Sequence, residues 1–187
     1  MSGDLSTAVH FHGYVLTNVY LRISTDTRDQ VVRFWDQTGA ISDSAEARRR
    51  VDELVVVARN ATGDVAGVNT VYAGRLDGFG PVYLYRSFVR PEDRRPGLSR
   101  MLLMCATDHL HRLYRTQALR ADQAPFADQA APRGLAFVAE NEKLLRRGAR
   151  QVLTRLGFRF IGHDARGVGV FLYRFDLASP SPSQPAR

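Results

Sequence analysis

The residues best suited to chemistry lie in a short basic turn between an apolar run at 82–89 and an amphipathic run at 98–113. The first run favours a strand and the second a helix, so the turn leads into a helix N-terminus. It contains Arg94, Gly97 and Ser99. Unpaired backbone N–H groups and the helix dipole attract an anion, glycine lets the backbone approach it, and arginine adds forked donors. The turn therefore predicts a phosphate-binding site.

Two widespread phosphate-binding motifs do not fit this turn. The sequence has no Gly-x-x-x-x-Gly-Lys-Ser/Thr, and its single lysine, Lys143, lies far along the chain. A dinucleotide-binding turn needs three glycines, whereas this one has Gly97 alone. The sequence therefore disfavours a P-loop nucleotidase and a dinucleotide-binding domain.

The turn and its flanks instead resemble the acyl-CoA-binding motif of the GNAT superfamily of N-acyltransferases. The core of that motif, Arg/Gln-x-x-Gly-x-Gly/Ala, is matched by Arg94, Gly97 and Ser99. The flanking residues that also fit are Val89, Pro91, Glu92, Leu102 and Leu103. The resemblance continues at 18–41, which is similar to the family's opening strand and first helix, and at 54–68, which is similar to its next hairpin. Leu156-Gly157-Phe158 resembles the tripeptide that closes the family's last core helix.

This resemblance implies an α/β (α+β) fold. Its central sheet would be mixed, mostly antiparallel and six to seven strands wide, splayed between the fourth and fifth strands and flanked by about four helices. We expect an N-terminal extension at 1–17 that can add a strand carrying His10 and His12 on one face, the acyltransferase domain at 18–177, and a disordered tail at 178–187.

The resemblance also implies an activity, the transfer of an acyl group from acyl-CoA to a primary amine by direct attack in a ternary complex. The co-substrate would be acetyl-CoA or a longer acyl-CoA, with acetyl favoured, and the acceptor a small molecule or a peptide or protein amine. The cofactor-binding residues would be Phe88, Val89, Arg94, Arg95, Pro96, Gly97, Leu98, Ser99, Arg100 and Asn141. Asn141 lies upstream of the family's usual Asn-x-x-Ala position, which reads Arg-Gly-Ala-Arg here. Gly97→Glu is expected to abolish CoA binding while leaving the fold intact.

The acid and the base are less clearly matched. Many family members carry a tyrosine four residues before the glycine of Leu-Gly-Phe, and Leu153 stands there in this chain. Tyr83, Tyr85 or Ser87 could protonate the leaving thiolate, or solvent could do so. Core packing is the other explanation of the two tyrosines. Glu53 and Glu140 are candidate bases because each lies at the end of an expected strand.

Composition sets the remaining expectations. The 187 residues suit one globular domain, and no apolar run approaches the roughly 18 residues of a membrane span. One cysteine, Cys105, excludes an internal disulfide, no metal site is predicted, and the cytoplasm is the expected compartment. The net charge of +7 leaves an RNA-directed basic protein as one alternative to the enzyme, and Leu153 suggests another, a non-catalytic acyl-CoA-binding protein. No known nucleic-acid-binding motif supports the RNA-directed alternative. The long loop expected at 119–133 favours binding or homodimer formation.

Overall fold

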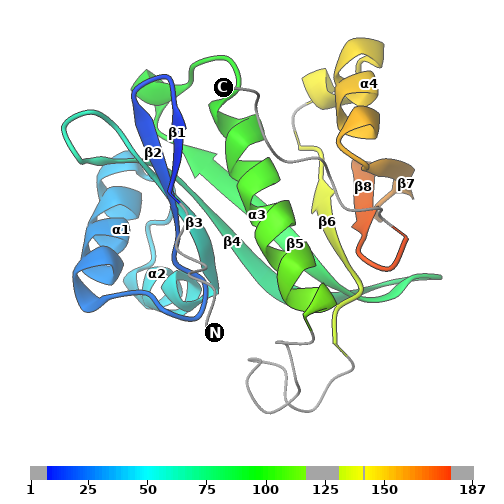
Figure 1. Cartoon of the computed structure of the whole chain (residues 1–187), viewed down its shortest axis with the longest axis horizontal. Helices are drawn as coiled ribbons and strands as arrows, with labels where there is room; N and C mark the ends of the chain where they lie inside the picture. The colour runs from blue at the N-terminus through cyan, green and yellow to red at the C-terminus, as the bar shows by residue number, and fades with distance from the viewer. Residues whose placement is uncertain (1–7, 117–130, 141, 178–187) are drawn as a thin grey trace. The chain divides into compact units, whose positions relative to one another are not determined.

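The computed structural model describes residues 8–116, 131–140 and 142–177 (Figure 1). The chain divides into two compact units, one formed by Met1–Tyr72 and Arg86–His109, the other by Ala73–Tyr85 and Leu110–Arg187. Twelve residues of the long loop expected at 119–133 (119–130), the whole tail expected at 178–187 and the cofactor candidate Asn141 lie outside the described residues.

A single mixed sheet has the strand order β1-β2-β3-β4-β5-β6-β8-β7. Its strands are β1 Val9–Phe11, β2 Tyr14–Asn18, β3 Leu54–Arg59, β4 Val65–Leu76, β5 Gly80–Val89, β6 Gly134–Val138, β7 Arg159–His163 and β8 Gly169–Arg174. The pairing of β5 with β6 is parallel, whereas β1–β2, β2–β3, β3–β4, β6–β8 and β7–β8 are antiparallel. The mixed, mostly antiparallel sheet is confirmed. Its eight strands exceed the expected six to seven.

The additional strand comes from the N-terminal hairpin of the first unit. His12 (φ 44°) and Gly13 (φ 82°) form a two-residue turn between the paired residues Phe11 and Tyr14. Positive φ at both turn positions matches the right-handed twist of the flanking strands. His12 therefore lies in the turn, and the expectation that it shares a strand face with His10 is wrong. The strand β2 also begins at Tyr14, inside the segment expected to be an extension.

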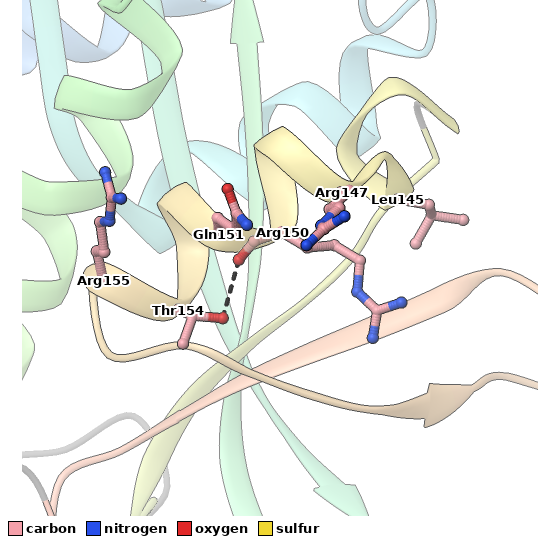
Figure 2. Close-up of a pocket in the computed structure, with 6 residues that line it drawn as sticks. All are labelled: Leu145, Arg147, Arg150, Gln151, Thr154 and Arg155. Carbon is pink, nitrogen blue, oxygen red and sulfur yellow. Dashed lines mark hydrogen bonds between the residues drawn. The ribbon is translucent and has the colours of Figure 1, made fainter.

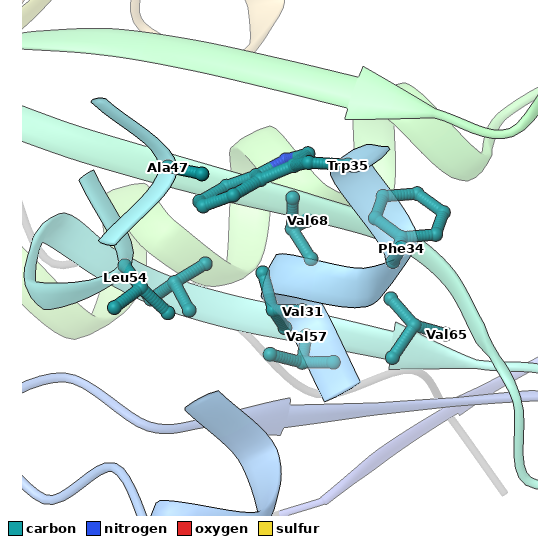
Figure 3. Close-up of a cluster of buried hydrophobic side chains, with 9 residues drawn as sticks. Val31, Phe34, Trp35, Ala47, Leu54, Val57, Val65 and Val68 are labelled. Atoms are coloured by element: carbon teal, nitrogen blue, oxygen red, sulfur yellow. The ribbon is translucent and has the colours of Figure 1, made fainter. Parts of the chain in front are cut away.

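Two helices of the first unit pack on β3 and β4. The helix α1 spans Thr25–Thr38, begins after an N-cap bond from the Thr27 N–H to Ser24 Oγ (3.2 Å), and ends at Gly39 with φ 65°. The helix α2 spans Ser44–Arg50 and is capped by Asp43. Figure 3 shows the buried cluster that these elements enclose, which comprises Val31, Phe34, Trp35, Ala47, Val51, Leu54, Val57, Val65 and Val68. The apolar stripe of α1 is thus the face that the sheet covers.

In the second unit, the end of β4 and the start of β5 form a tight hairpin. The strand β4 continues to Leu76 and β5 begins at Gly80, so three residues connect them. Gly74 permits this extension because a Cβ there would lie 2.4 Å from Leu84 Cδ1. Val82 of β5 packs with Ala136 and Leu172 in the core of this unit.

The chain between β6 and β7 forms two helical segments in place of one continuous helix. A short 3-10 helix at Glu142–Leu145 ends at Arg146, which is extended (ψ 146°), and α4 then spans Arg147–Arg155. Leu145 packs closely over β8, since a Cβ at Gly169 would lie 2.4 Å from Leu145 Cδ2. The break therefore places Leu145 against the sheet. The strands β7 and β8 form an antiparallel hairpin after α4.

Candidate functional site

The predicted phosphate turn lies in the first unit, between β5 and the helix α3 (Leu98–Arg115). It opens with a 3-10 helix at Pro91–Asp93. Arg90 fixes the entry to the turn, because its backbone N–H donates to Ala66 O and its Nη2 donates to Val65 O, both at 2.8 Å. These bonds fix the start of the turn to the first residues of β4.

The helix begins with backbone N–H groups open to a ligand. Gly97 O accepts from the Met101 N–H at 2.8 Å, which makes Gly97 the residue preceding the first helical turn. The Leu98 N–H has only a long contact of 3.4 Å to Arg95 O. Within the described part of the chain, the N–H groups of Ser99 and Arg100 have no backbone acceptor. Such groups and the positive end of the helix dipole suit an anion.

The N-terminal hairpin packs directly against this turn. The Tyr14 hydroxyl donates to Asp93 Oδ1 at 2.9 Å, and burial together with this bond raises the pKa of Tyr14. A Cβ at Gly97 would lie 2.9 Å from Phe11 Cζ, and Gly97 has φ 97°. We therefore expect Gly97→Glu to strain the turn as well as to block CoA, because a side chain there adopts an unfavourable φ and meets Phe11.

The arginines of the turn differ in how firmly they are held. Arg94 Nε donates to Val89 O at 3.2 Å, and its guanidinium carbon lies 5.8 Å from the centre of the Phe88 ring. Arg95 interacts with the Tyr14 hydroxyl, and all three arginines, Arg94, Arg95 and Arg100, are exposed. The turn thus combines three exposed guanidiniums with the open N–H groups of α3.

Asn69 and Gly67 position the first turns of α3, a role that the sequence did not reveal. Asn69 is fully buried, accepts from the Val56 N–H (2.9 Å) and donates to Leu102 O (2.8 Å). Gly67 lies under the end of β5, where a Cβ would come within 3.1 Å of Val89 Cγ2 and 3.3 Å of Leu102 Cδ1. An Asn inside an expected strand, between Val68 and Thr70, was the available signal, since a buried Asn side chain needs hydrogen-bond partners.

Of the proposed acid and base residues, Glu53 and Ser87 belong to the first unit. Glu53 ends a 3-10 helix at Val51–Glu53, its side chain is 14% exposed, and its Oε1 accepts from Arg49 Nη1 at 2.7 Å. Glu53 Oε2 lies 3.9 Å from Nη1 of Arg86, whose guanidinium carbon lies 4.0 Å from the centre of the Tyr72 ring. The carboxylate is therefore flanked by two guanidiniums. Ser87 is exposed.

Tyr83, Tyr85 and Leu153 belong to the second unit. Tyr83 is fully buried, and Tyr85 is half-buried with its ring 6.4 Å from that of Phe137. The burial of Tyr83 favours packing over proton transfer. Leu153 is also buried, with 6% of its surface exposed. The recorded pairing of β5 with β6 covers Tyr83 and Leu84, opposite Leu135 and Ala136, and no later residue of β5 within the described chain.

No group of three His, Cys, Asp or Glu side chains within the described residues could hold a metal ion. Among the described helices, none is long and apolar enough to cross a membrane.

Comparison with known proteins concerns the fold. No protein-family model matches the chain, and no curated protein sequence is similar enough to match it. A ribosomal-protein-S5-alanine acetyltransferase from Vibrio fischeri matches with a TM-score of 0.55 and 12% identity over 96% of this chain and 100% of its own. A GNAT-family acetyltransferase from Bacillus cereus matches with a TM-score of 0.52 and 15% identity over 86% and 96%.

A chimera of the Vibrio cholerae spermidine N-acetyltransferase SpeG and hSSAT matches with a TM-score of 0.53 and 13% identity, over 88% of this chain and 96% of its own. Identities this low establish a shared fold and leave the activity open. The chain therefore has the fold of the GNAT-family acetyltransferases.

Proposed function

We propose that this protein is an N-acyltransferase that moves an acyl group, with acetyl favoured, from acyl-CoA to a primary amine. The observation that carries this proposal is the phosphate turn: a glycine with φ 97° at the start of α3, followed by open N–H groups at Ser99 and Arg100, in a fold shared with acetyltransferases. CoA carries phosphates that suit this helix terminus.

The turn would hold the phosphates of CoA, and the end of β5 would hold the rest of the donor. Ser99 and Arg100 would donate backbone N–H groups, while Arg94, Arg95 and Arg100 would add guanidinium donors. The pantetheine arm would pair with the backbone of Phe88 and Val89 as an added strand. Arg94 supports this arrangement because it bonds Val89 O at 3.2 Å and so links the phosphate turn to the end of β5.

In the proposed reaction the amine nitrogen attacks the thioester carbon, the carbon–sulfur bond breaks and CoA leaves as a thiolate. A backbone N–H near Phe88 would stabilise the oxyanion, and one such donor contributes about 2.7–4 kcal/mol. Holding both substrates together supplies a further large part of the rate. The amine must also lose a proton, and the thiolate must gain one from Tyr85, Ser87 or solvent.

Glu53 and Glu140 remain the candidate bases, and their surroundings differ. Glu53 is mostly buried, and its two carboxylate oxygens face the guanidiniums of Arg49 and Arg86. The Glu140 side chain is 78% exposed and lies 4.0 Å from Arg166. If Glu53 is the base, Glu53→Gln should abolish turnover while CoA binding persists. Normal turnover of Glu53→Gln would leave Glu140 or solvent as the base.

The acceptor is an amine whose class the fold leaves open. The neighbours named above act, by their names, on a ribosomal-protein alanine and on spermidine, so this fold accommodates both protein and small-molecule amines.

The identity of the donor can be determined separately. We expect mass spectrometry of material that co-purifies with the protein to identify the acyl-CoA.

A charge placed at Ser99 tests donor binding with little risk to the fold. Ser99 is exposed in the first turn of α3, where an acidic side chain stabilises a helix. We expect Ser99→Glu to weaken CoA binding at least tenfold, measured by isothermal titration, with no loss of thermal stability. The matched Ser99→Gln variant should bind nearly as the parent does. Equal CoA affinity of Ser99→Glu and the parent would refute the assignment of this turn.

A second candidate is a protein that binds acyl-CoA without turnover. The observation that favours it is Leu153, a buried leucine where many members of the family carry a tyrosine acid. Tight binding of acetyl-CoA, with no CoA release in the presence of a broad panel of amines, would make this candidate the better one.

A further inference from the structure

In the second unit, α4 carries a group of arginines along one face. An open depression beside it has a volume of about 670 Å³. Figure 2 shows the residues that line it, Leu145, Arg147, Arg150, Gln151, Thr154 and Arg155. The positions on α4 recur every three or four residues and so lie on one side of the helix. Three of the six lining side chains are therefore guanidiniums, and none is a carboxylate.

Within the described residues, no ion pair involves Arg147, Arg150 or Arg155, whereas Asp164 and Asp176 of the same unit pair with other arginines. Arg150 is nevertheless held in place, because its guanidinium carbon lies 4.4 Å from the centre of the Phe160 ring. A group of like charges of this kind costs free energy unless an anion offsets it.

We propose that this depression binds a phosphate group of a small organic phosphate. Guanidiniums give phosphate two parallel, charge-assisted hydrogen bonds, and Gln151 and Thr154 add neutral polar groups beside them. The volume of about 670 Å³ lies within the range of small-ligand sites. Leu145 supplies an apolar wall for the organic part.

A small ligand fits these observations better than RNA does. Single-stranded RNA binds through exposed aromatic faces and many phosphate contacts. Here the nearby aromatic ring, Phe160, already stacks with Arg150, and the depression offers three guanidiniums.

The phosphate could belong to either of two molecules. It could be a phosphate of the acyl-CoA donor, in which case this inference rests on the proposed function. It could instead belong to a separate phosphorylated molecule, and then the inference stands without that function.

The test compares CoA, dephospho-CoA and inorganic pyrophosphate as ligands in isothermal titrations of the full chain. The variant is Arg147→Gln/Arg150→Gln, whose two side chains are exposed. The control is Arg75→Gln/Arg115→Gln, which removes the same charge from two exposed positions of the same unit. Thermal unfolding verifies that both remain folded.

If the donor supplies the phosphate, the parent prefers CoA to dephospho-CoA, and the Arg147/Arg150 variant loses about tenfold or more of its CoA affinity and most of that preference. If a separate molecule supplies it, CoA affinity is unchanged, and pyrophosphate binding to the CoA-saturated parent is lost in the variant. The control variant should change neither the CoA affinity nor the binding of pyrophosphate.

The inference is overturned if the Arg147/Arg150 variant and the parent bind all three ligands alike, or if the control loses as much as the variant does. RNA that displaces pyrophosphate with a steep salt dependence would overturn the small-ligand assignment. A parent that binds pyrophosphate through these arginines but binds no CoA would refute the proposed function and leave this inference standing.

Discussion

Tyr14 donates a hydrogen bond of 2.9 Å to Asp93, and this bond joins the N-terminal hairpin to the turn that precedes α3. The two residues are 79 positions apart in the sequence. Asp93 in turn lies 3.9 Å from Arg90, which is anchored to β4. The hairpin therefore acts as a support for the proposed phosphate site, beyond adding a strand to the sheet.

Loss of this bond should affect donor binding more than chemistry. We expect Tyr14→Phe to lower the free energy of unfolding by about 0.5–1.5 kcal/mol. The KM for acyl-CoA should rise while kcat changes little, because Tyr14 supports the turn and touches no reacting atom. Steady-state kinetics checks this. A fall in kcat with KM unchanged would contradict a supporting role.

Gly97→Ala should be costly even though it adds a single methyl group. A residue with a side chain at φ 97° is strained by about 1–3 kcal/mol, and its Cβ would meet Phe11 Cζ at 2.9 Å. The double variant Phe11→Ala/Gly97→Ala removes the contact but not the strain. We expect a double-mutant cycle of unfolding free energies to give a favourable coupling between the two substitutions. Strictly additive changes in the unfolding free energy would mean that the Phe11 ring moves aside from the new methyl group at no cost in free energy.

Leu153 should matter for stability and not for proton transfer. Leu153→Ala removes a buried side chain and should lower the free energy of unfolding by about 2–5 kcal/mol, while Leu153→Tyr should cost about 1–3 kcal/mol through overpacking. The pH dependence of kcat should be the same in Leu153→Ala and the parent. A new ionisation in the Leu153→Tyr profile with raised kcat would show instead that this position reaches the thiolate.

The ion pairs of Glu46 should make the stability of the protein depend on pH in the acid range. Its hydrogen bonds with Arg49 and then Arg50 lower the pKa of Glu46 from its usual 4.5 to about 2. A lowered pKa in the folded state stabilises the protein above pH 4.5, and this contribution is lost as the pH falls towards 2. Glu46→Gln should therefore be less stable than the parent at neutral pH, and the difference should shrink across this window. Denaturant unfolding at several pH values measures it, and a constant difference would contradict the assignment.

Salt dependence separates a CoA-binding enzyme from an RNA-directed protein. We expect CoA affinity to weaken modestly between about 50 and 200 mM salt, because few ionic contacts are involved. A partner that neutralises about six or more phosphates would lose roughly a thousandfold in affinity over the same range. Tight tRNA binding at 200 mM salt would make the RNA-directed function primary.

The sequence by itself determined the features that depend on neighbouring residues. Asp43 and Gly39 mark helix ends because capping involves groups a few residues apart. The turn at Gly63 and the start of α3 at Leu98 follow from glycine and the change of hydrophobic period. The resemblance to the GNAT motif depended on the same local spacing, which is why the fold and the phosphate turn could be anticipated.

Only the tertiary structure decided how distant segments meet. The contacts of Tyr14 with Asp93 and of Asn69 with Leu102 join parts of the chain far apart in sequence, and no local pattern encodes them. The break at Arg146 likewise follows from the packing of Leu145 over Gly169, which overrides a continuous helical pattern. The sequence also could not predict the burial of Tyr83 or the ion pair of Glu53 with Arg49, because the type of a residue does not reveal its exposure or its partners. Local spacing therefore determined the turn, whereas long-range packing determined which residues support it.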